Sequence, residues 1–91
     1  MKLAKRLLLT GSVQSIFFKT FIKENAEINN IKGFIRSLED GKVDIFLEGE
    51  SADVSAMADI CKKGPKYAQI RSVEEKEERL QDFKEFKILR F

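Results

Sequence analysis

The residues that could carry out chemistry gather in one short stretch, "GSVQSIFFK", which runs from Gly11 to Lys19. It lies between an apolar run, "LLLT", and a run with helical spacing, "TFIKENAE". A strand, a tight polar turn and a helix start form the arrangement in which backbone N–H groups can converge on an anion. The stretch is therefore a candidate phosphate-binding loop with a lysine at its end.

The composition excludes several other kinds of chemistry. The chain has no histidine, which removes histidine bases, Ser-His-Asp machinery and the usual imidazole metal sites. Cys61 is its only cysteine, so no intramolecular disulfide can form. With 17 Lys and Arg against 15 Asp and Glu, the formal charge of +2 does not make nucleic acid or an anionic membrane the expected partner. We expect no metal and no other cofactor.

The length of 91 residues allows one domain, which we assign to residues 1–91. Apolar residues make up 43% and charged residues 35%, as in a globular domain with a soluble surface. The N-terminus begins as a signal peptide would, but its apolar run is much shorter than the roughly 7–15 residues that such signals need. No run approaches the roughly 18 residues of a membrane span. We therefore expect a cytoplasmic protein, and we expect it to be a monomer.

The patterns on either side of the candidate loop predict the elements that hold it. Residues 3–10 read as a strand, and the apolar positions from Ile16 to about Asn29 fall at helical spacing on one side. After Gly33, two apolar runs flank "EDGK", and the Asp-Gly pair predicts a tight hairpin with positive φ at both central positions. Along the returning strand, alternation gives one mostly apolar face, made of Val43, Ile45 and Leu47.

The second half of the chain predicts another helix and further strands. Ser51 can cap the helix, which ends at "KKGP" with cations, a glycine and a proline stop. Met57 and Cys61 lie on its apolar stripe and are expected to pack in the core. Residues 68–74 read as a strand, "EEKEERL" as a solvated stretch and "FKILRF" as a last strand. This order predicts an α+β fold, a ferredoxin-like βαββαβ sandwich with an antiparallel sheet and two helices on one face.

Three stretches match, in order and at the right spacing, the motifs of one known family. They are "GSVQSIFFK" at the first helix, "GFIRSLEDGKV" at the hairpin and "KGPKYAQI" after the second helix. The chain also ends on a Phe-x-Ile strand, as the members of that family do. Each match alone is weak, but together they are specific. The chain resembles the acylphosphatase family over nearly its whole length.

The resemblance implies hydrolysis of a carboxyl-phosphate anhydride to a carboxylate and inorganic phosphate. In the family, the loop amides and an arginine at the end of the loop hold the phosphoryl group, and an asparagine on the facing strand positions the attacking water. The corresponding catalytic positions here are Lys19 and Ser37. The resemblance assigns phosphate binding to the loop residues Gln14, Ser15, Ile16, Phe17, Phe18 and Lys19. Such chemistry needs neither metal nor histidine, because the site mainly orients the reacting groups and neutralises the charge of the phosphoryl group.

Three positions depart from the family pattern, and each bears on the implied activity. Lys19 stands where members have arginine; it keeps the charge but lacks the planar fork that grips two phosphate oxygens. Ser37 stands where members have asparagine, and its hydroxyl reaches less far toward a water. Ser15 replaces a loop glycine and restricts the backbone there. The resemblance therefore implies that hydrolysis is weak or lost in this chain.

Two other classes of function stay open. A non-catalytic module could keep the fold and use the loop for anion binding, or use Phe17 to contact a protein partner. The same strand order occurs in RNA-recognition domains, and "KGFI" at residues 32–35 resembles the start of their signature. Those domains need a second exposed ring on the central strands, which the residues after Phe34 do not supply. We expect no nucleic acid partner; the expected ligand is a small phosphorylated substrate, inorganic phosphate or sulfate.

Overall fold

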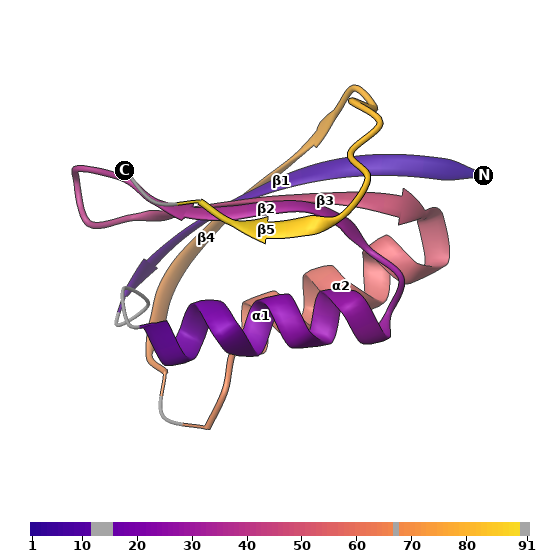
Figure 1. Ribbon diagram of the computed structural model, residues 1–91. Coiled ribbons are helices and arrows are strands. Elements are labelled where there is room, and N and C mark those ends of the chain that lie inside the picture. Colours follow the sequence, from indigo (N-terminus) through magenta and orange to yellow (C-terminus); the bar gives the residue numbers. More distant parts are fainter. Residues whose placement is uncertain (12–15, 67, 90–91) are drawn as a thin grey trace.

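The computed structural model describes residues 1–11, 16–66 and 68–89 (Figure 1). The elements follow one another in the predicted order, including the short last strand. The elements are β1 (Lys2–Gly11), α1 (Ile16–Ile28), β2 (Lys32–Ser37), β3 (Val43–Glu50), α2 (Ser51–Lys63), β4 (Ile70–Glu78) and β5 (Phe86–Ile88).

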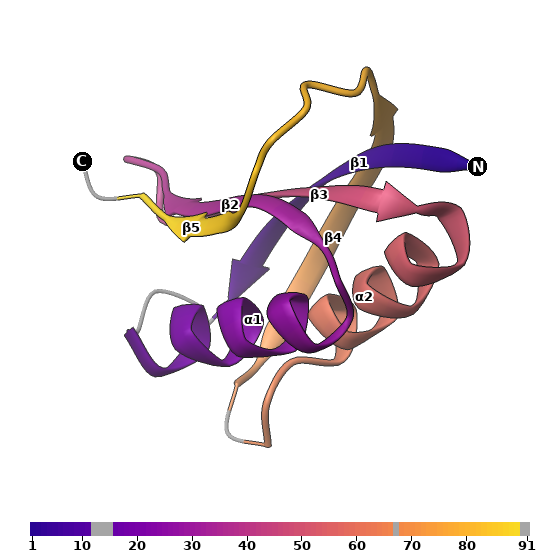
Figure 2. The same ribbon diagram turned by 45° about the vertical axis from the view of Figure 1, so that its right-hand side comes forward.

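The strands form one sheet in the order β4-β1-β3-β2-β5. Neighbouring strands are antiparallel except β2 and β5, which run parallel, so the sheet is mixed at this edge. Both helices lie on the same side of the sheet (Figures 1 and 2). Helix α1 packs against β2 and β5, whereas α2 packs against β1 and β3. The ferredoxin-like sandwich is therefore confirmed.

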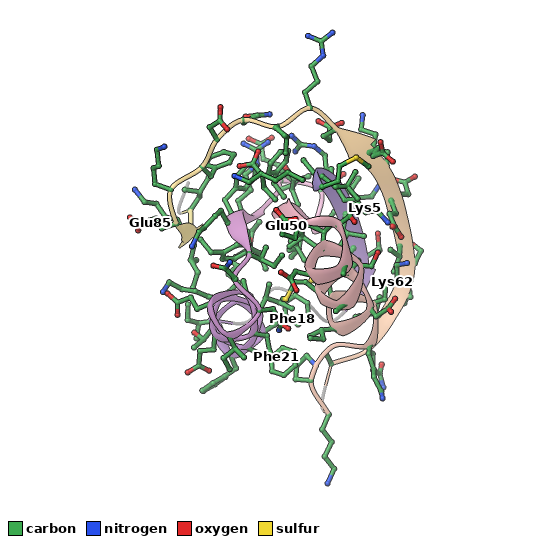
Figure 3. All side chains as sticks on the ribbon, turned by 90° about the vertical axis from the view of Figure 1, so that its right-hand side faces the viewer. Lys5, Phe18, Phe21, Glu50, Lys62 and Glu85 are labelled. Carbon is green, nitrogen blue, oxygen red and sulfur yellow. The ribbon has the colours of Figure 1, made fainter. Side chains whose placement is uncertain are left out.

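The main core lies between the sheet and the two helices. The apolar face predicted for β3 is confirmed, because Val43, Ile45 and Leu47 are fully buried there. Phe18 and Phe21 project from α1 toward α2 (Figure 3). Cys61 is buried in the same core as predicted, and burial raises the pKa of its thiol far above the ordinary value. The thiol therefore stays protonated and serves packing. Neither α1 nor α2, the helices of the described chain, is long and apolar enough to span a bilayer.

The hairpin between β2 and β3 has a different turn from the one predicted. Gly41 has a positive φ of 86°, but Asp40 does not, so the turn is not the two-residue type. Instead Leu38 donates its N–H to the Lys42 carbonyl at 2.8 Å, and Gly41 donates to the Leu38 carbonyl at 3.2 Å. The Asp40 carboxylate accepts the Lys42 N–H at 3.1 Å. A side-chain bond of this kind stabilises a longer loop, in which a single glycine supplies the positive φ.

The start of α2 also differs from the prediction. Ser51 is the first helical residue, and Glu50 occupies the N-cap without a side-chain capping bond. Strand β3 runs directly into the helix, and the Ser51 N–H donates to the Met1 carbonyl at 2.8 Å. Ser51 is therefore not the cap, because it already lies inside the helix, where the N-terminal residue Met1 accepts its N–H. The predicted end is confirmed: Gly64 has φ 68° and donates its N–H to the Ile60 carbonyl.

Strand β4 is longer than the sequence indicated, because it includes most of the charged stretch that we expected to be solvated. It is an edge strand, so its outer side stays open to water. Glu75 is held on this strand by two lysines, at 2.7 Å from the Lys5 ammonium and 2.5 Å from that of Lys62. Charged residues suit such an edge because they oppose pairing with another chain.

The face of the sheet opposite the helices, called the open face below, is covered as well. The β4–β5 connection (residues 79–85) arches over it (Figures 1 and 2). Phe83 and Leu89 pack there against a second apolar cluster. Among the described residues, those buried on this side are apolar or acidic, namely Ala4, Phe34, Phe46, Asp44 and Glu48.

Candidate phosphate site

The predicted site residues that the structure describes lie at one end of the molecule. Helix α1 packs against β2 and runs opposite to it, so the N-terminus of α1 and the end of β2 lie at the same end (Figure 1). Two of the predicted phosphate-binding residues, Gln14 and Ser15, lie outside the described residues. The features of the site given below therefore belong to the residues on either side of the loop, which end at Gly11 and resume at Ile16.

Gly11 fixes the point at which the chain leaves the sheet. Its φ is 143°, and the pairing with β4 shifts register between Thr10 and Gly11. A side chain at this position would place its Cβ 2.0 Å from the Gln69 carbonyl oxygen. Glycine is therefore required by both the backbone conformation and the close approach of β4.

The first turn of α1 presents its residues in three directions. Phe18 is buried in the core, whereas Phe17 is 83% exposed and Ile16 is 52% exposed. Phe17 thus lies off the buried stripe, as its position in the sequence indicated. This turn carries no acidic residue that would oppose an anion at the positive end of the helix.

Lys19 follows Phe18 and is half-buried. Within the described part of the chain, its ammonium makes no hydrogen bond and no ion pair. Lys23, one turn further, contrasts with it: its ammonium lies 2.9 Å from the Glu27 carboxylate, and that hydrogen bond raises the pKa of Lys23. The Lys19 ammonium therefore places a positive charge near the start of α1. No carboxylate of the described chain forms an ion pair with it.

Ser37 is the last residue of β2 and pairs with Val43 of β3. Side chains alternate along a strand, so Ser37 shares the helix-covered face with Ile35, which is fully buried in the core. Its hydroxyl oxygen is buried and has no hydrogen-bond partner among the residues that the structure describes. A buried hydroxyl in this state normally signals a water or ligand that would satisfy it.

Arg36, the positively charged residue next to Ser37 in the sequence, does not contribute to this site. Arg36 points to the open face, where its Nε donates to the Asp44 Oδ2 at 3.0 Å. The described residues also include no group of three or more His, Cys, Asp or Glu side chains that could hold a metal ion. Lys19 and the N-terminal end of α1 therefore supply positive charge at the candidate site.

The rings that resembled part of an RNA-recognition signature are not exposed. Phe34 and Phe46 stack on each other with ring centroids 5.7 Å apart, and Phe83 packs against both. Phe46 is fully buried and Phe34 is 9% exposed. Neither ring offers a free face for a nucleobase in this conformation. The expected absence of a nucleic acid partner stays a prediction.

Comparison with known sequences identifies the family of the chain. The profile of the acylphosphatase family, described simply as "Acylphosphatase", matches residues 5–88. A curated acylphosphatase from Acaryochloris marina is 32% identical over 85 residues, which are 93% of this chain and 91% of the relative. One from Rubrobacter xylanophilus is 37% identical over 73 residues, 80% of this chain and 66% of the relative. This chain belongs to the acylphosphatase family.

Solved structures agree with this assignment. The acylphosphatase from Bacillus subtilis has a TM-score of 0.90 and 25% identity, and the match covers 97% of this chain and 99% of that one. An acylphosphatase from Coxiella burnetii shares the fold at a TM-score of 0.89 and 23% identity, over 97% of this chain and 93% of that one. Full-length HypF, solved in a phosphate- and nucleotide-bound form, matches at 0.85 and 27% identity, with 98% of this chain on 12% of that one.

Proposed function

We propose that this protein binds the phosphoryl group of a small acyl phosphate and hydrolyses it slowly to a carboxylate and inorganic phosphate. The observation that supports this most is the buried, unpartnered hydroxyl of Ser37 at the end where α1 begins. Lys19, without an ion pair in the described chain, lies in the first turns of that helix. A phosphoryl group would offset the charge of Lys19, and the water that attacks it would form a hydrogen bond with the Ser37 hydroxyl.

We propose that electrostatic attraction and hydrogen bonds from backbone amides both contribute to phosphate binding. The N-terminal end of α1 carries partial positive charge, and the preceding backbone amides can donate to phosphate oxygens. Lys19 adds a full charge beside them. The loop residues Gln14 to Phe18 are proposed to contribute through their backbone amides, as the family resemblance implies.

Hydrolysis needs one water and no cofactor. The water oxygen attacks phosphorus, the bond between phosphorus and the bridging oxygen breaks, and the acyl group leaves as a carboxylate. A carboxylate is already a stable leaving group, so positioning and charge neutralisation carry the catalysis. Ser37 is proposed to contact the attacking water through its hydroxyl.

Turnover is expected to be slow for two reasons. Lysine neutralises the phosphoryl group as a point charge but does not grip two of its oxygens at once, as arginine does. Serine holds a water with one hydroxyl and from a shorter side chain than asparagine. The loss of one oriented donor costs about 10²–10³ in rate, and two such losses need not add.

A second function, anion binding without hydrolysis, is favoured by the same pair of substitutions. It keeps the cation at Lys19 and the positive end of α1, and it does not require a positioned water. It predicts that inorganic phosphate binds and that acyl phosphates are not turned over.

The test measures binding and turnover on one preparation. Inorganic phosphate is titrated into the ¹⁵N-labelled protein at low and at high salt, and hydrolysis of acetyl phosphate is followed with the spontaneous rate subtracted. We expect weak phosphate binding that tightens at low salt, because Lys19 lies near solvent, together with slow hydrolysis. Lys19→Gln should abolish binding, whereas Lys2→Gln, at an exposed lysine at the opposite end of the molecule, should not. Binding without turnover would favour the second function, and no binding would reject both.

A further inference from the structure

Phe17 projects into solvent at the start of α1, beside the candidate phosphate site. It is 83% exposed, whereas the next residue, Phe18, is 2% exposed in the core. Ile16, the first residue of the helix, is 52% exposed. Exposed apolar side chains gain free energy when another apolar group covers them. Two adjacent ones at the edge of a ligand site are therefore suited to contact an apolar part of the ligand.

The ring of Phe17 lies close to the place proposed for the phosphoryl group. The backbone amides at the start of α1, including that of Phe17, are the proposed donors to phosphate oxygens. The side chain of the same residue begins at the next backbone atom. Side chains of a helix also lean toward its N-terminus, so the ring covers the start of the helix. A group bonded to the phosphoryl group is therefore within reach of the ring.

The direction of attack decides on which side of phosphorus the acyl group lies. In phosphoryl transfer the attacking and leaving oxygens lie roughly in line, on opposite sides of phosphorus. Ser37, proposed to contact the attacking water, belongs to β2 and lies on the sheet side of α1 (Figure 1). The leaving carboxylate therefore lies on the side of α1 that faces away from the sheet. Phe17 is exposed on that side, because the buried stripe of the helix runs through Phe18 and Ile22.

The first turn of α1 separates charge from apolar surface. It contains no acidic residue. Residues two positions apart on a helix do not face each other, so Lys19 and Phe17 project on different sides of α1. The phosphoryl group would meet the cation on one side of the helix start, and the acyl group would meet apolar side chains on the other.

We propose that Phe17 is a specificity-determining residue that selects acyl phosphates with a large apolar acyl group, an aromatic one above all. Phe17 and Ile16 contact the acyl group, while the loop amides and Lys19 hold the phosphoryl group. Contact between two rings adds to the free energy gained from burial of apolar area. This inference rests on the proposed function, because it needs the phosphoryl group at the start of α1.

The experiment compares benzoyl phosphate with acetyl phosphate, which share the phosphoryl group and differ in the acyl group. Hydrolysis of each is followed with the spontaneous rate subtracted, and the selectivity is the ratio of the two kcat/KM values. We expect wild type to prefer benzoyl phosphate and Phe17→Ala to lower the ratio roughly three- to tenfold. Phe17→Leu keeps a large apolar side chain and should retain part of the selectivity. A ratio is used because any general effect of the substitution on the site cancels.

The matched control is Ile28→Ala. Ile28 is 80% exposed on the same helix but lies at its other end, far from the candidate site. Its loss should leave the ratio unchanged. Succinyl phosphate, whose acyl group carries a second carboxylate, tests whether the exposed lysine at the end of α2, Lys63, selects the acyl group instead.

Binding gives a second readout that does not need turnover. Benzylphosphonate and methylphosphonate are titrated into the ¹⁵N-labelled full chain. Benzylphosphonate should bind wild type more tightly and shift the amide signals of Ile16 and Phe17. Phe17→Ala should remove most of the difference in affinity, whereas Ile28→Ala should preserve it. If neither acyl phosphate is turned over, this pair of phosphonates decides alone.

Inorganic phosphate, titrated into the same preparation, separates this inference from the proposed function. If phosphate does not bind, the proposed function fails and this inference fails with it. If phosphate binds but Phe17→Ala changes neither the ratio nor the difference between the phosphonates, only this inference is overturned. Equal effects of Phe17→Ala and Ile28→Ala, or a preference for succinyl over benzoyl phosphate, would also overturn it.

Discussion

Ser37 faces Val43 across the last pair of the β2–β3 ladder, and this pairing turns its hydroxyl toward the helix-covered side of the sheet. Because α1 runs opposite to β2, that hydroxyl and the first turns of α1 share one end of the molecule (Figure 1). The hydroxyl is buried, and no group of the described chain forms a hydrogen bond with it. An asparagine at the same place would extend one heavy-atom group further from the same backbone and offer both a donor and an acceptor.

Glu48 is expected to be a strong determinant of stability, although it lies far from the candidate site. Its carboxylate accepts the backbone N–H groups of three residues in the β4–β5 connection. Glu48→Ala removes all three acceptors at once, and we expect the free energy of unfolding to fall by about 2–3 kcal/mol. Urea unfolding followed by circular dichroism measures this.

The matched control for that experiment is Glu77→Ala. Glu77 is exposed on the edge strand β4, and its side chain makes no hydrogen bond or ion pair in the described chain. Its loss should change the free energy of unfolding by less than about 0.5 kcal/mol. Equal effects of the two substitutions would show that the contacts of Glu48 do not stabilise the protein.

Asp44 is expected to hold two arginines together on the open face. It is 2% exposed, and its Oδ2 lies 2.6 Å from Arg6 and 3.0 Å from Arg36. Both guanidinium groups also lie over the Phe34 ring, at 5.8 and 5.5 Å from its centroid. Asp44→Asn leaves two like charges side by side, and we expect a loss of about 1–3 kcal/mol in unfolding free energy.

A double-mutant cycle separates repulsion between the arginines from other effects of the Asp44 change. If repulsion causes the loss, Arg36→Gln in the Asp44→Asn background should restore part of the stability. Arg36→Gln alone should instead destabilise the protein. Additive effects of the two substitutions would contradict the coupling that the geometry indicates.

Glu75 is expected to make stability depend on acid pH. The hydrogen bond from Lys5, and then that from Lys62, lowers the pKa of Glu75 below its ordinary value of 4.5. A carboxylate with a lowered folded pKa contributes stability above its unfolded pKa, and loses it as pH falls through the folded value. The stability gap between wild type and Glu75→Gln should therefore be present near neutral pH and shrink below about pH 4. A gap that is constant across this range would contradict the assignment.

Local sequence patterns predicted those features whose causes are local. The apolar alternation that buries Val43 and Ile45, the glycine stop of α2 and the order of the elements all follow from neighbours a few residues apart. The type of the hairpin turn was predicted wrongly although its cause is also local: the Asp-Gly pair fits more than one turn, and the Asp40 side chain favours the longer one by accepting the Lys42 N–H.

Long-range pairing explains what the sequence missed. The stretch around Glu75 looks solvated, but the lysines that hold it come from β1 and α2. Glu48 likewise finds its partners more than thirty residues away, in the β4–β5 connection. For the candidate site, the resemblance identified Lys19 and Ser37, and the structure adds that the Ser37 hydroxyl is buried without a partner. Their joint role stays a prediction.

The central claim is that Lys19 and Ser37 limit an acylphosphatase reaction. The most direct measurement is the rate of acetyl phosphate hydrolysis by wild type, Lys19→Arg, Ser37→Asn and the double variant, at equal folded concentration. We predict slow turnover by wild type and a rate about 10²-fold higher in the double variant, well above either single change. The reason is that holding the phosphoryl group and positioning the attacking water act together. A double variant that still binds inorganic phosphate but hydrolyses no faster than wild type would contradict the claim.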